Sequence, residues 1–312
     1  LSGLTKTLSH EWSNVFCRAL DADASIDARH LAEAITGELF DIDTNTVEIG
    51  LSHAENGESG RATLIAATPG TAQTKNTGAQ LTKSDKVLVT GGAKGVTFEC
   101  ALTLAKQCKS HFILAGRSKH ITSAELPQWA QGKQEKELKP AAIAHLQATG
   151  DKPTPKKVDT LLKPVLSSLE INAALAAFNE IGASAEYLSL DVSNHESVAK
   201  TLANFEGITG LIHGAGVLAD KHIQDKTLDE LNMVYGTKVG GLEAVLGGLD
   251  SSKLKLIAMF SSAAGFYGNT GQSDYSMSNE ILNKAALQLS ARNPKAKVMS
   301  FNWGPWDGGM VN

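Results

Sequence analysis

Cysteine, long apolar runs and a strong charge of either sign are all scarce in this sequence. Its three cysteines, Cys17, Cys100 and Cys108, are odd in number and irregular in spacing, so the sequence predicts neither a disulfide framework nor a bound metal. The apolar runs have the length of strands, far below the ~18–20 residues that cross a bilayer. No signal peptide is visible, and we therefore expect a cytoplasmic protein outside the membrane. A net charge of −4 provides no basic surface for nucleic acid or anionic lipid.

The composition is that of a globular protein, with 42% hydrophobic and 20% charged residues. A length of 312 residues allows one large core or two moderate ones. The first residue is not methionine and the last follows a "GPWDGGM" turn, so we expect a segment of a longer polypeptide. The polar, Gly/Thr-rich stretch 69–85 reads as a linker. It divides the chain into 1–84, too short for a complete α/β domain, and 85–312.

Strand-like and helix-like patterns alternate after the linker. Apolar strand-like runs occur at 86–90, 111–116, 185–192, 210–216, 255–262 and 297–304, with helical patterns near 98–109, 194–205, 227–248 and 274–292. Near-continuous apolar strands that alternate with helices predict an α/β fold with a doubly wound parallel sheet. The long connection at about 119–184 has helical spacing. We expect it to be a helical insertion on a surface edge without a catalytic role.

A glycine-rich turn follows the first predicted strand and precedes a helix. It reads "VLVTGGAKGVTFE", and the positions expected to contact a dinucleotide are Thr90, Gly91, Gly92, Lys94, Gly95 and Val96. Glycines here would let the backbone approach a pyrophosphate at the helix N-terminus. The spacing is TGxxxGxx rather than GxGxxG, and Thr97 stands where a related form has its last glycine. Such a turn can also arise for packing alone, but its place after the first strand favours a cofactor site.

The ends of the next strands indicate which cofactor is bound. Arg117 and Ser118 end the second strand without an acidic residue, which favours the 2′-phosphate of NADPH over NADH, although a solvated surface arginine would look the same. Asp191, with Val192 behind it, would bind the adenine or cap the next helix. After the fourth strand, "HGAG" would line the cofactor crevice: His213, Gly214, Ala215 and Gly216. We expect His213 to be packed or hydrogen-bonded rather than an acid or base.

Tyr275 is the best candidate among four tyrosines for a proton donor to a ketone. A cation about 4 Å from a phenolate is worth about 4 kcal/mol at an effective dielectric constant of about 20, or roughly three pKa units. The position one helical turn after Tyr275 is Asn279, and Lys284 lies on the opposite face of that helix. Lys238, in the helix before the fifth strand, is the candidate cation. Without other information it could equally be an exposed lysine.

These residues resemble the ketoreductase domains of modular polyketide synthases, a branch of the short-chain dehydrogenase/reductase superfamily. The resemblance rests on "FSSAAGFYGNTGQSDYSMSN" and "NWGPW" and covers about 85–310. In that branch the preceding helix supplies the lysine and asparagine follows the tyrosine by four, which matches Lys238 and Asn279. The stretch "GLTKTLSHEW" resembles the second half of the non-catalytic structural subdomain before such domains. The glycine-rich turn and the long insertion resemble the ketoreductase of bacterial polyunsaturated fatty acid synthases.

The resemblance implies a Rossmann-type doubly wound parallel sheet preceded by part of a truncated Rossmann-like structural subdomain. It implies NADPH-dependent reduction of a 3-ketoacyl chain on an acyl carrier protein, with other domains of the same synthase as partners. Tyr275 would donate the proton, Ser262 would bind the substrate oxygen, and Lys238 would lower the pKa of the tyrosine. Asn279 would fix either the lysine or a relay water. Asp220 in "LAD", together with Tyr267 where an alternative type has tryptophan, favours a D-hydroxy product.

Two alternatives remain open at this point. One is a free-standing short-chain dehydrogenase that acts on a small alcohol or sugar. The other is a catalytically inactive NADP-binding scaffold domain of a megasynthase. The displaced lysine argues against the first, and the presence of all four candidate catalytic residues argues against the second.

Overall fold

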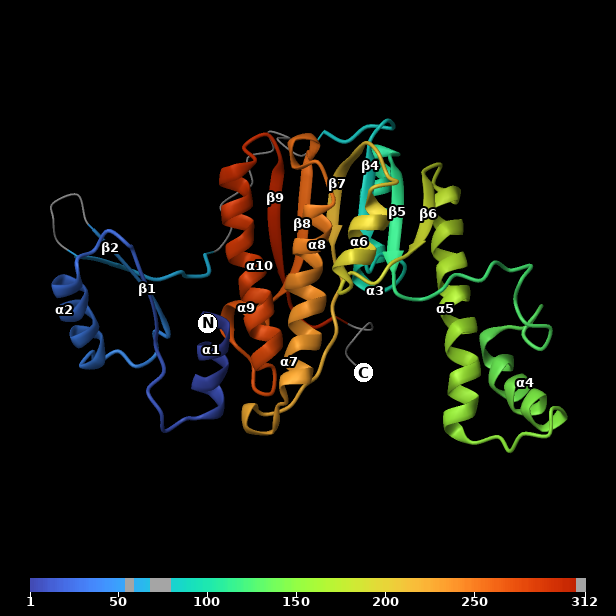
Figure 1. Ribbon diagram of the computed structural model, residues 1–312, viewed down its shortest axis with the longest axis horizontal. Helices are drawn as coiled ribbons and strands as arrows, with labels where there is room; N and C mark the ends of the chain where they lie inside the picture. Colours follow the sequence, from blue (N-terminus) through green and yellow to red (C-terminus); the bar gives the residue numbers. More distant parts are fainter. Residues whose placement is uncertain (54–58, 68–79, 307–312) are drawn as a thin grey trace.

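The computed structural model describes residues 1–53, 59–67 and 80–306 (Figure 1). Most of the predicted linker therefore lies outside the described residues. A central sheet carries a small three-stranded unit at one end and a helical hairpin at the other (Figure 1).

The central sheet has six strands, all parallel, in the order β6-β5-β4-β7-β8-β9. The strands are β4 (Lys86–Thr90), β5 (His111–Gly116), β6 (Ser184–Ser189), β7 (Ile208–His213), β8 (Leu256–Ser262) and β9 (Lys297–Trp303). The chain runs outward from β4 to β6 and then returns to the other side of β4. Between β4 and β7 the strand order therefore reverses, and ligands bind at the carboxyl ends of such a switch point. The predicted doubly wound fold is confirmed.

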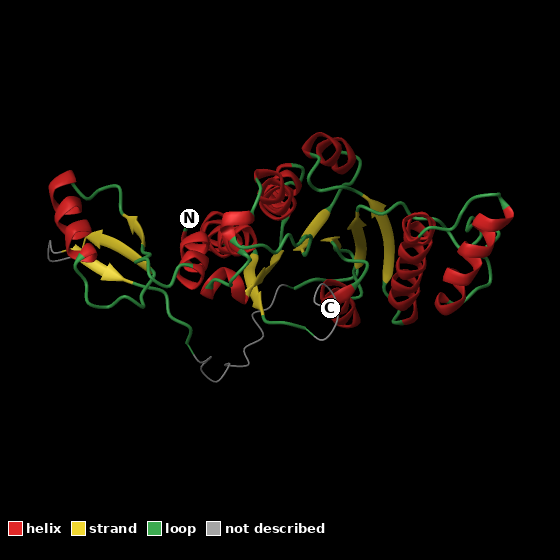
Figure 2. Ribbon diagram, turned by 90° about the horizontal axis from the view of Figure 1, so that it is seen from below, coloured by secondary structure: helices red, strands yellow, loops and turns green. Residues whose placement is uncertain are grey.

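Helices cover both faces of this sheet (Figure 2). One face holds α3 (Gly95–Cys108) and α5 (Pro155–Glu180); the other holds α6 (His195–Leu202), α8 (Gly241–Gly247) and α10 (Ser273–Arg292). Shorter pieces are α7 (Leu228–Tyr235), α9 (Ala263–Tyr267), the 3-10 turns η1 (Ile223–Asp225) and η3 (Ser251–Lys253), and a π-helical turn, η2 (Gly236–Gly240). The predicted single helix 227–248 is thus interrupted by η2.

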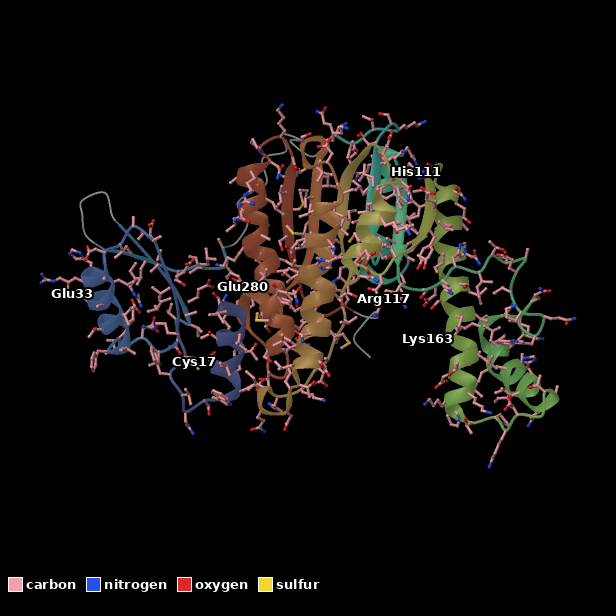
Figure 3. The ribbon with its side chains drawn as sticks, in the orientation of Figure 1. Cys17, Glu33, His111, Arg117, Lys163 and Glu280 are labelled. Atoms are coloured by element: carbon pink, nitrogen blue, oxygen red, sulfur yellow. The ribbon has the colours of Figure 1, made fainter. Side chains whose placement is uncertain are left out.

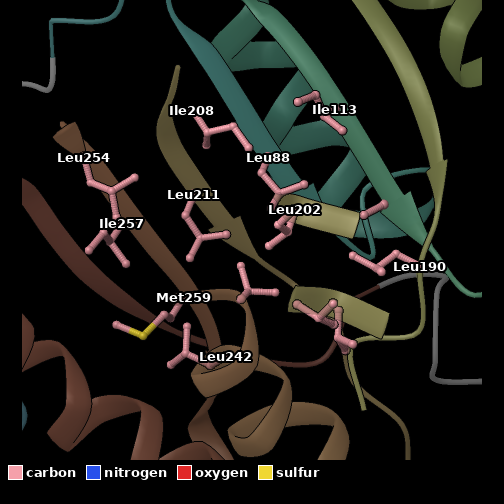
Figure 4. Packing of buried hydrophobic residues seen from close by; sticks show 14 of the residues in the cluster. Leu88, Ile113, Leu190, Leu202, Ile208, Leu211, Leu242, Leu254, Ile257 and Met259 are labelled. Atoms are coloured by element: carbon pink, nitrogen blue, oxygen red, sulfur yellow. The ribbon is translucent and has the colours of Figure 1, made fainter. Parts of the chain in front are cut away.

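The core lies in two layers because successive strand residues face opposite sides of the sheet. Leu88 packs with Leu211, Ile257 and Met259 under α6, α8 and α10 (Figure 4). Its neighbours Val87 and Val89 pack with Phe112, Leu114 and Phe178 under α3 and α5. Burial on both faces explains why these strands are apolar at nearly every position.

Residues 119–184 contain α4 (Glu135–Ala148) and α5. The first half of α5 packs on α4 through Leu138, Leu146 and Leu162, and this pair extends away from the sheet (Figure 1). The second half of α5 covers the sheet through Ala174 and Phe178. The second half of α5 is therefore the crossover helix between β5 and β6, and this part of the predicted insertion belongs to the α/β fold. The 26 residues of α5 are long and apolar enough to span a bilayer by length and composition, which the sequence analysis overlooked. Helices of soluble proteins pass the same test, and the buried side chains of α5 pack on α4 and on the sheet.

The N-terminal elements are α1 (Ser2–Glu11), β1 (Ala19–Ala22), α2 (Ala28–Leu39), β2 (Glu48–His53) and β3 (Ser59–Ala62). β2 pairs with β1 in parallel and with β3 in antiparallel around Ile26, Ile49 and Leu51. The strand-like run "RATLIAA" (61–67) overlaps only the end of β3, which begins at Ser59 and ends at Ala62. α1 leaves this unit and lies on α10, where a Cβ on Gly3 would come within 2.4 Å of the Ser276 carbonyl oxygen. The contacts of α1 therefore cross the boundary predicted at residues 84 and 85.

We predict that Phe178→Ala lowers the free energy of unfolding by about 3–5 kcal/mol, because it removes a fully buried ring between Phe98 and Phe112. Urea denaturation measures the change. Phe40→Ala, at a side chain that is 82% exposed, is the control and should change it by less than about 0.5 kcal/mol. Equal effects of the two substitutions would mean that α5 does not cover the sheet.

Candidate active site

The carboxyl ends of β4, β7 and β8 and the N-terminus of α10 meet at one edge of the sheet. Figure 3 shows Arg117 at this edge, just past the end of β5, whereas His111 marks the opposite edge. The topology therefore brings together the predicted phosphate loop, the "HGAG" segment and the predicted catalytic residues.

Tyr275 lies in the first turn of α10 and is 9% exposed. The Nζ atom of Lys238 lies 5.3 Å from the centroid of its ring. Ser262 ends β8, and its hydroxyl accepts a hydrogen bond from the amide of Ala264 at 3.2 Å. Asn279 is fully buried and donates from Nδ2 to the carbonyl oxygen of Tyr275 at 2.8 Å. The side chains of Ser262 and Asn279 lie close enough to that of Tyr275 to act on its pKa, although Oδ1 of Asn279 is buried without a hydrogen-bond partner among the described residues.

The pKa of Tyr275 is raised, which differs from the expected lowering. Burial is the largest cause of the increase; the polar side chains of Asn279 and Ser262 lower the pKa by less, and the charge of Asp220 adds to the increase. Lys238 donates from Nζ to the carbonyl oxygen of Phe260 at 2.9 Å. Burial lowers the pKa of Lys238 to about 8, so that its ammonium form still predominates at pH 7. A raised pKa keeps the phenol of Tyr275 protonated and therefore available as a proton donor.

Lys238 is held by the π-helical turn η2, which the sequence analysis missed. Such turns are rare and occur frequently at functional sites. A Cβ on Gly216 would lie 3.1 Å from Cε of Lys238, and one on Gly241 would lie 2.7 Å from Val192. The glycine-rich sequence "GTKVGG" was the available signal, since glycine both weakens a regular helix and permits this close packing.

His213 connects this turn to the end of β4. Its ring is fully buried, with Nδ1 2.9 Å from the Thr90 hydroxyl and Nε2 2.8 Å from the carbonyl oxygen of Lys238. Since a carbonyl only accepts, Nε2 carries the hydrogen and Nδ1 accepts from Thr90, whose oxygen accepts from the amide of Ala215 at 3.3 Å. Burial lowers the pKa of His213 to about 4. The ring is therefore neutral and hydrogen-bonded, as the sequence analysis expected.

The predicted phosphate loop has the conformation that its glycines permit. Gly91 has φ +69°, and a Cβ there would approach the carbonyl oxygen of Gly214 to 2.9 Å, while Gly95 has φ +61° and faces open space. Lys94 is the N-cap residue of α3, and its side chain makes no hydrogen bond to the first amides of the helix. Gly92 packs on Val89, and Val96 packs partly on the core.

Thr97, which replaces the usual glycine, fills the space above Gly214. A Cβ at position 214 would lie 2.2 Å from Oγ1 of Thr97. The larger residue on α3 is therefore matched by the smallest residue after β7.

The remaining predicted cofactor residues differ in their surroundings. Arg117 is exposed and makes no hydrogen bond or ion pair within the described residues. The carbonyl oxygen of Ser118 accepts from the Tyr187 hydroxyl at 2.9 Å, so Tyr187 is more than a packing residue. Asp191 accepts from the amide of Ser193 at 3.0 Å and closes a turn. The side-chain cap of α6 is Asn194, not the predicted Asp191, and Val192 is buried in the core.

Asp220 directly follows three residues that pack near Tyr275, Val217 to Ala219, and Tyr267 is the last residue of α9. Asp220 accepts from Nε2 of Gln272 at 2.8 Å, and Tyr267 is exposed against Phe266. A buried ion pair next to them was not predicted: Nζ of Lys226 lies 2.9 Å from Oδ1 of Asp274. The only local signal was an acidic residue directly before Tyr275. Within the part of the chain that the structure describes, no three His, Cys, Asp or Glu side chains group as metal ligands.

Comparisons with known proteins identify the family of this chain. A family model described as "KR domain" matches residues 86–308. A polyunsaturated fatty acid synthase of Thraustochytrium sp. is 39% identical over 99% of this chain, which spans 11% of that protein. Polyketide synthase PksN of Bacillus subtilis is 32% identical over 44% of this chain, an alignment that spans 3% of PksN. The predicted resemblance to both kinds of synthase is thus confirmed.

Two solved structures show the same fold. The first ketoreductase of the tylosin polyketide synthase matches with a TM-score of 0.67 and 21% identity, over 100% of this chain and 55% of that one. An N-terminal ketoreductase from the macrolactin assembly line matches with a TM-score of 0.66 and 22% identity, over 98% and 52% of the two chains.

We predict that Gly214→Ala destabilises the protein by about 1–3 kcal/mol, because its methyl group would overlap Thr97. The double variant Thr97→Gly/Gly214→Ala should recover most of the loss, since it exchanges the two sizes. Unfolding free energies of the four proteins form a double-mutant cycle. Additive effects would contradict direct packing of the two residues.

His213 should make folding stability depend on pH. Its folded pKa of about 4 lies below the ordinary value of 6.5, so the unfolded chain binds a proton first and stability is lost as pH falls from about 6.5 toward 4. Between pH 7.5 and 5 we expect the free energy of unfolding to fall by about 2 kcal/mol more in the wild type than in His213→Gln. Denaturation of both proteins at the two pH values tests this. A loss of the same size in both would show that His213 does not titrate in this way.

Proposed function

This chain belongs to the KR domain family, and on that basis we propose that it catalyses the NADPH-dependent reduction of a 3-ketoacyl chain on an acyl carrier protein. The product is the 3-hydroxyacyl chain, in the D configuration. The observation that carries the proposal is the meeting of Tyr275, Ser262, Lys238 and Asn279 beside the glycine-rich loop. The reaction takes place within a larger synthase of the polyketide or polyunsaturated fatty acid type, in the cytoplasm.

The residues around the switch point fit a dinucleotide. The first amides of α3, which the N-cap residue Lys94 does not cap with its side chain, suit a pyrophosphate. The exposed guanidinium of Arg117 suits a 2′-phosphate. The segment His213–Gly216 and the turn at Asp191 line the crevice. When bound, NADPH supplies the hydride.

Tyr275 supplies the proton. Its protonated hydroxyl donates to the oxygen of the substrate as negative charge develops there, and the hydroxyl of Ser262 binds the same oxygen. The ammonium of Lys238, 5.3 Å from the ring centroid, stabilises the phenolate that remains. Asn279 holds the Tyr275 backbone through its Nδ2 hydrogen bond, and its side chain lies near enough to that of Tyr275 to lower its pKa. A proton from solvent then restores the phenol.

Residues 85–312 form the NADP-binding catalytic part in this proposal. Residues 1–84 belong to a non-catalytic structural subdomain and contribute no group to the chemistry. The acyl chain would contact Asp220, on the segment after β7, and Tyr267, at the end of α9. Through this contact the two residues determine the configuration of the product. The acyl carrier domain and the other domains of the synthase are the partners.

The central test is oxidation of NADPH in the presence of a 3-ketoacyl thioester, followed by chiral analysis of the product. We expect reduction of the thioester, no reaction with small alcohols or sugars, and a preference for NADPH over NADH. Activity with NADH alone would contradict the role of Arg117. Cofactor binding without any reduction would favour an inactive scaffold.

Tyr275→Phe should abolish this reduction while NADPH still binds, because only the transferable proton is lost. Tyr235→Phe is the matched control, since Tyr235 is more exposed and lies outside the site; it should keep wild-type turnover. Steady-state kinetics and cofactor fluorescence measure the two properties. Undiminished turnover in Tyr275→Phe would refute the assignment.

A further inference from the structure

Glu11, the last residue of α1, is a buried carboxylate outside the residues assigned to the chemistry. Its side chain is 3% exposed. Oε1 accepts from the amide of Gly271 and Oε2 from the amide of Ile223, both at 2.8 Å. The Nδ1 atom of His222 lies 3.6 Å from Oε2. One side chain of the N-terminal segment thus binds two backbone amides that lie more than 200 residues away along the chain.

Both amides belong to the loops that border Tyr275. Ile223 is on the loop between β7 and α7, which carries Asp220, and Gly271 is on the loop directly before α10. The loops are also bound to each other: the amide of Lys221 donates to the carbonyl oxygen of Gly271 at 2.9 Å, and Gln272 donates to Asp220 at 2.8 Å. Asp220 in turn raises the pKa of Tyr275. Glu11 therefore holds the pair of loops next to the reacting group.

Other residues of α1 contact the second loop along its length. Thr7 accepts from the amide of Asn269 at 3.3 Å, and His10 donates from Nε2 to the carbonyl oxygen of Tyr267 at 2.9 Å. Gly268 has φ +77°, and a Cβ there would lie 2.6 Å from the carbonyl carbon of Lys6. α1 therefore forms one wall behind the loop from Tyr267 to Gly271.

The first loop is anchored from the other side by Lys226. Its Nζ atom donates to the carbonyl oxygen of Ala219 at 2.6 Å and lies 2.9 Å from Asp274, the residue before Tyr275. Asp220 is thus placed between an anchor on the catalytic helix and an anchor on α1. Loss of either anchor would let the loop move relative to Tyr275.

We propose that Glu11 is a positioning residue that fixes the two loops bordering Tyr275 and thereby the orientation in which a substrate meets it. This inference rests on the proposed function and extends it: a residue of the non-catalytic segment determines the configuration of the product. Carboxylate geometry is required because both amides are donors and only a carboxylate accepts through both oxygens. A glutamine presents its amide group to one of the two N–H groups and releases that loop.

The test compares Glu11→Gln with the wild type, with Glu33→Gln as the control. Glu33 lies on α2 of the same N-terminal unit and is exposed beside Arg29. The first measurement is hydrogen exchange of the amides of Ile223 and Gly271, which needs no activity. We expect faster exchange at one or both amides in Glu11→Gln, and unchanged exchange in the phosphate loop and in Glu33→Gln.

The second measurement is kinetic. In Glu11→Gln we expect kcat/KM for a 3-ketoacyl thioester to fall on the order of tenfold or more, and the product to contain more of the minor enantiomer. The KM for NADPH should stay at its wild-type value, because the phosphate loop does not contact Glu11. If Glu11→Gln does not fold, Thr7→Val tests the same contact surface and should show a smaller effect in the same direction.

Unchanged exchange together with an unchanged enantiomer ratio in Glu11→Gln would overturn the proposal. A uniform loss of stability, cofactor affinity and turnover with the wild-type enantiomer ratio would also overturn it, because it would assign Glu11 a purely structural role. A wild-type protein without 3-ketoacyl reductase activity would instead refute the proposed function. The exchange measurement would then decide alone whether Glu11 fixes the two loops.

Discussion

A lysine ammonium buried beside the ring of Tyr275 is the constraint around which this site is built. Removing a charge from water is costly unless other groups solvate it, and no carboxylate pairs with Lys238 among the described residues. The carbonyl oxygen of Phe260 binds its Nζ atom, and the π-helical turn directs the side chain inward. Glycines at 216 and 241 leave the space that this placement needs. The cost of burial is visible in the lowered pKa of the lysine.

The backbone of the same lysine is linked by hydrogen bonds to the end of β4. A neutral His213 connects the Lys238 carbonyl oxygen to the hydroxyl of Thr90, the last residue before the phosphate loop. The turn that holds Lys238 and the strand that leads into the glycine-rich loop therefore share one chain of hydrogen bonds. Burial of His213 keeps the ring neutral, and only the neutral ring can accept from Thr90 while donating to Lys238.

The N-terminal segment is bound to the catalytic helix by charge as well as by packing. Lys6 on α1 lies 2.7 Å from Glu48 of β2 and 3.4 Å from Glu280 of α10, and Lys284 lies 2.7 Å from Glu48. Figure 3 shows Glu280 between α1 and α10. Burial alone would raise the pKa of Glu48, but its pairs with Lys284 and Lys6 outweigh burial and lower the pKa to about 2. Through them and through Glu11, a segment without reacting groups contacts the elements that carry Tyr275 and Asp220.

The sequence by itself determined the parallel sheet and the glycine-rich loop, because apolar periodicity and glycine spacing are local properties of the chain. The candidate set Tyr275, Ser262, Lys238 and Asn279 came from the resemblance of its motifs to polyketide synthase ketoreductases. Only the tertiary structure decided how α5 divides between the sheet and α4, that Lys238 lies in a π-helical turn, and that burial raises the pKa of Tyr275. It alone brought Glu11 to the amides of Ile223 and Gly271 and Lys226 to Asp274. Burial depends on the whole fold. Almost every residue type has a backbone amide, so the sequence does not reveal which amide will donate to a distant side chain.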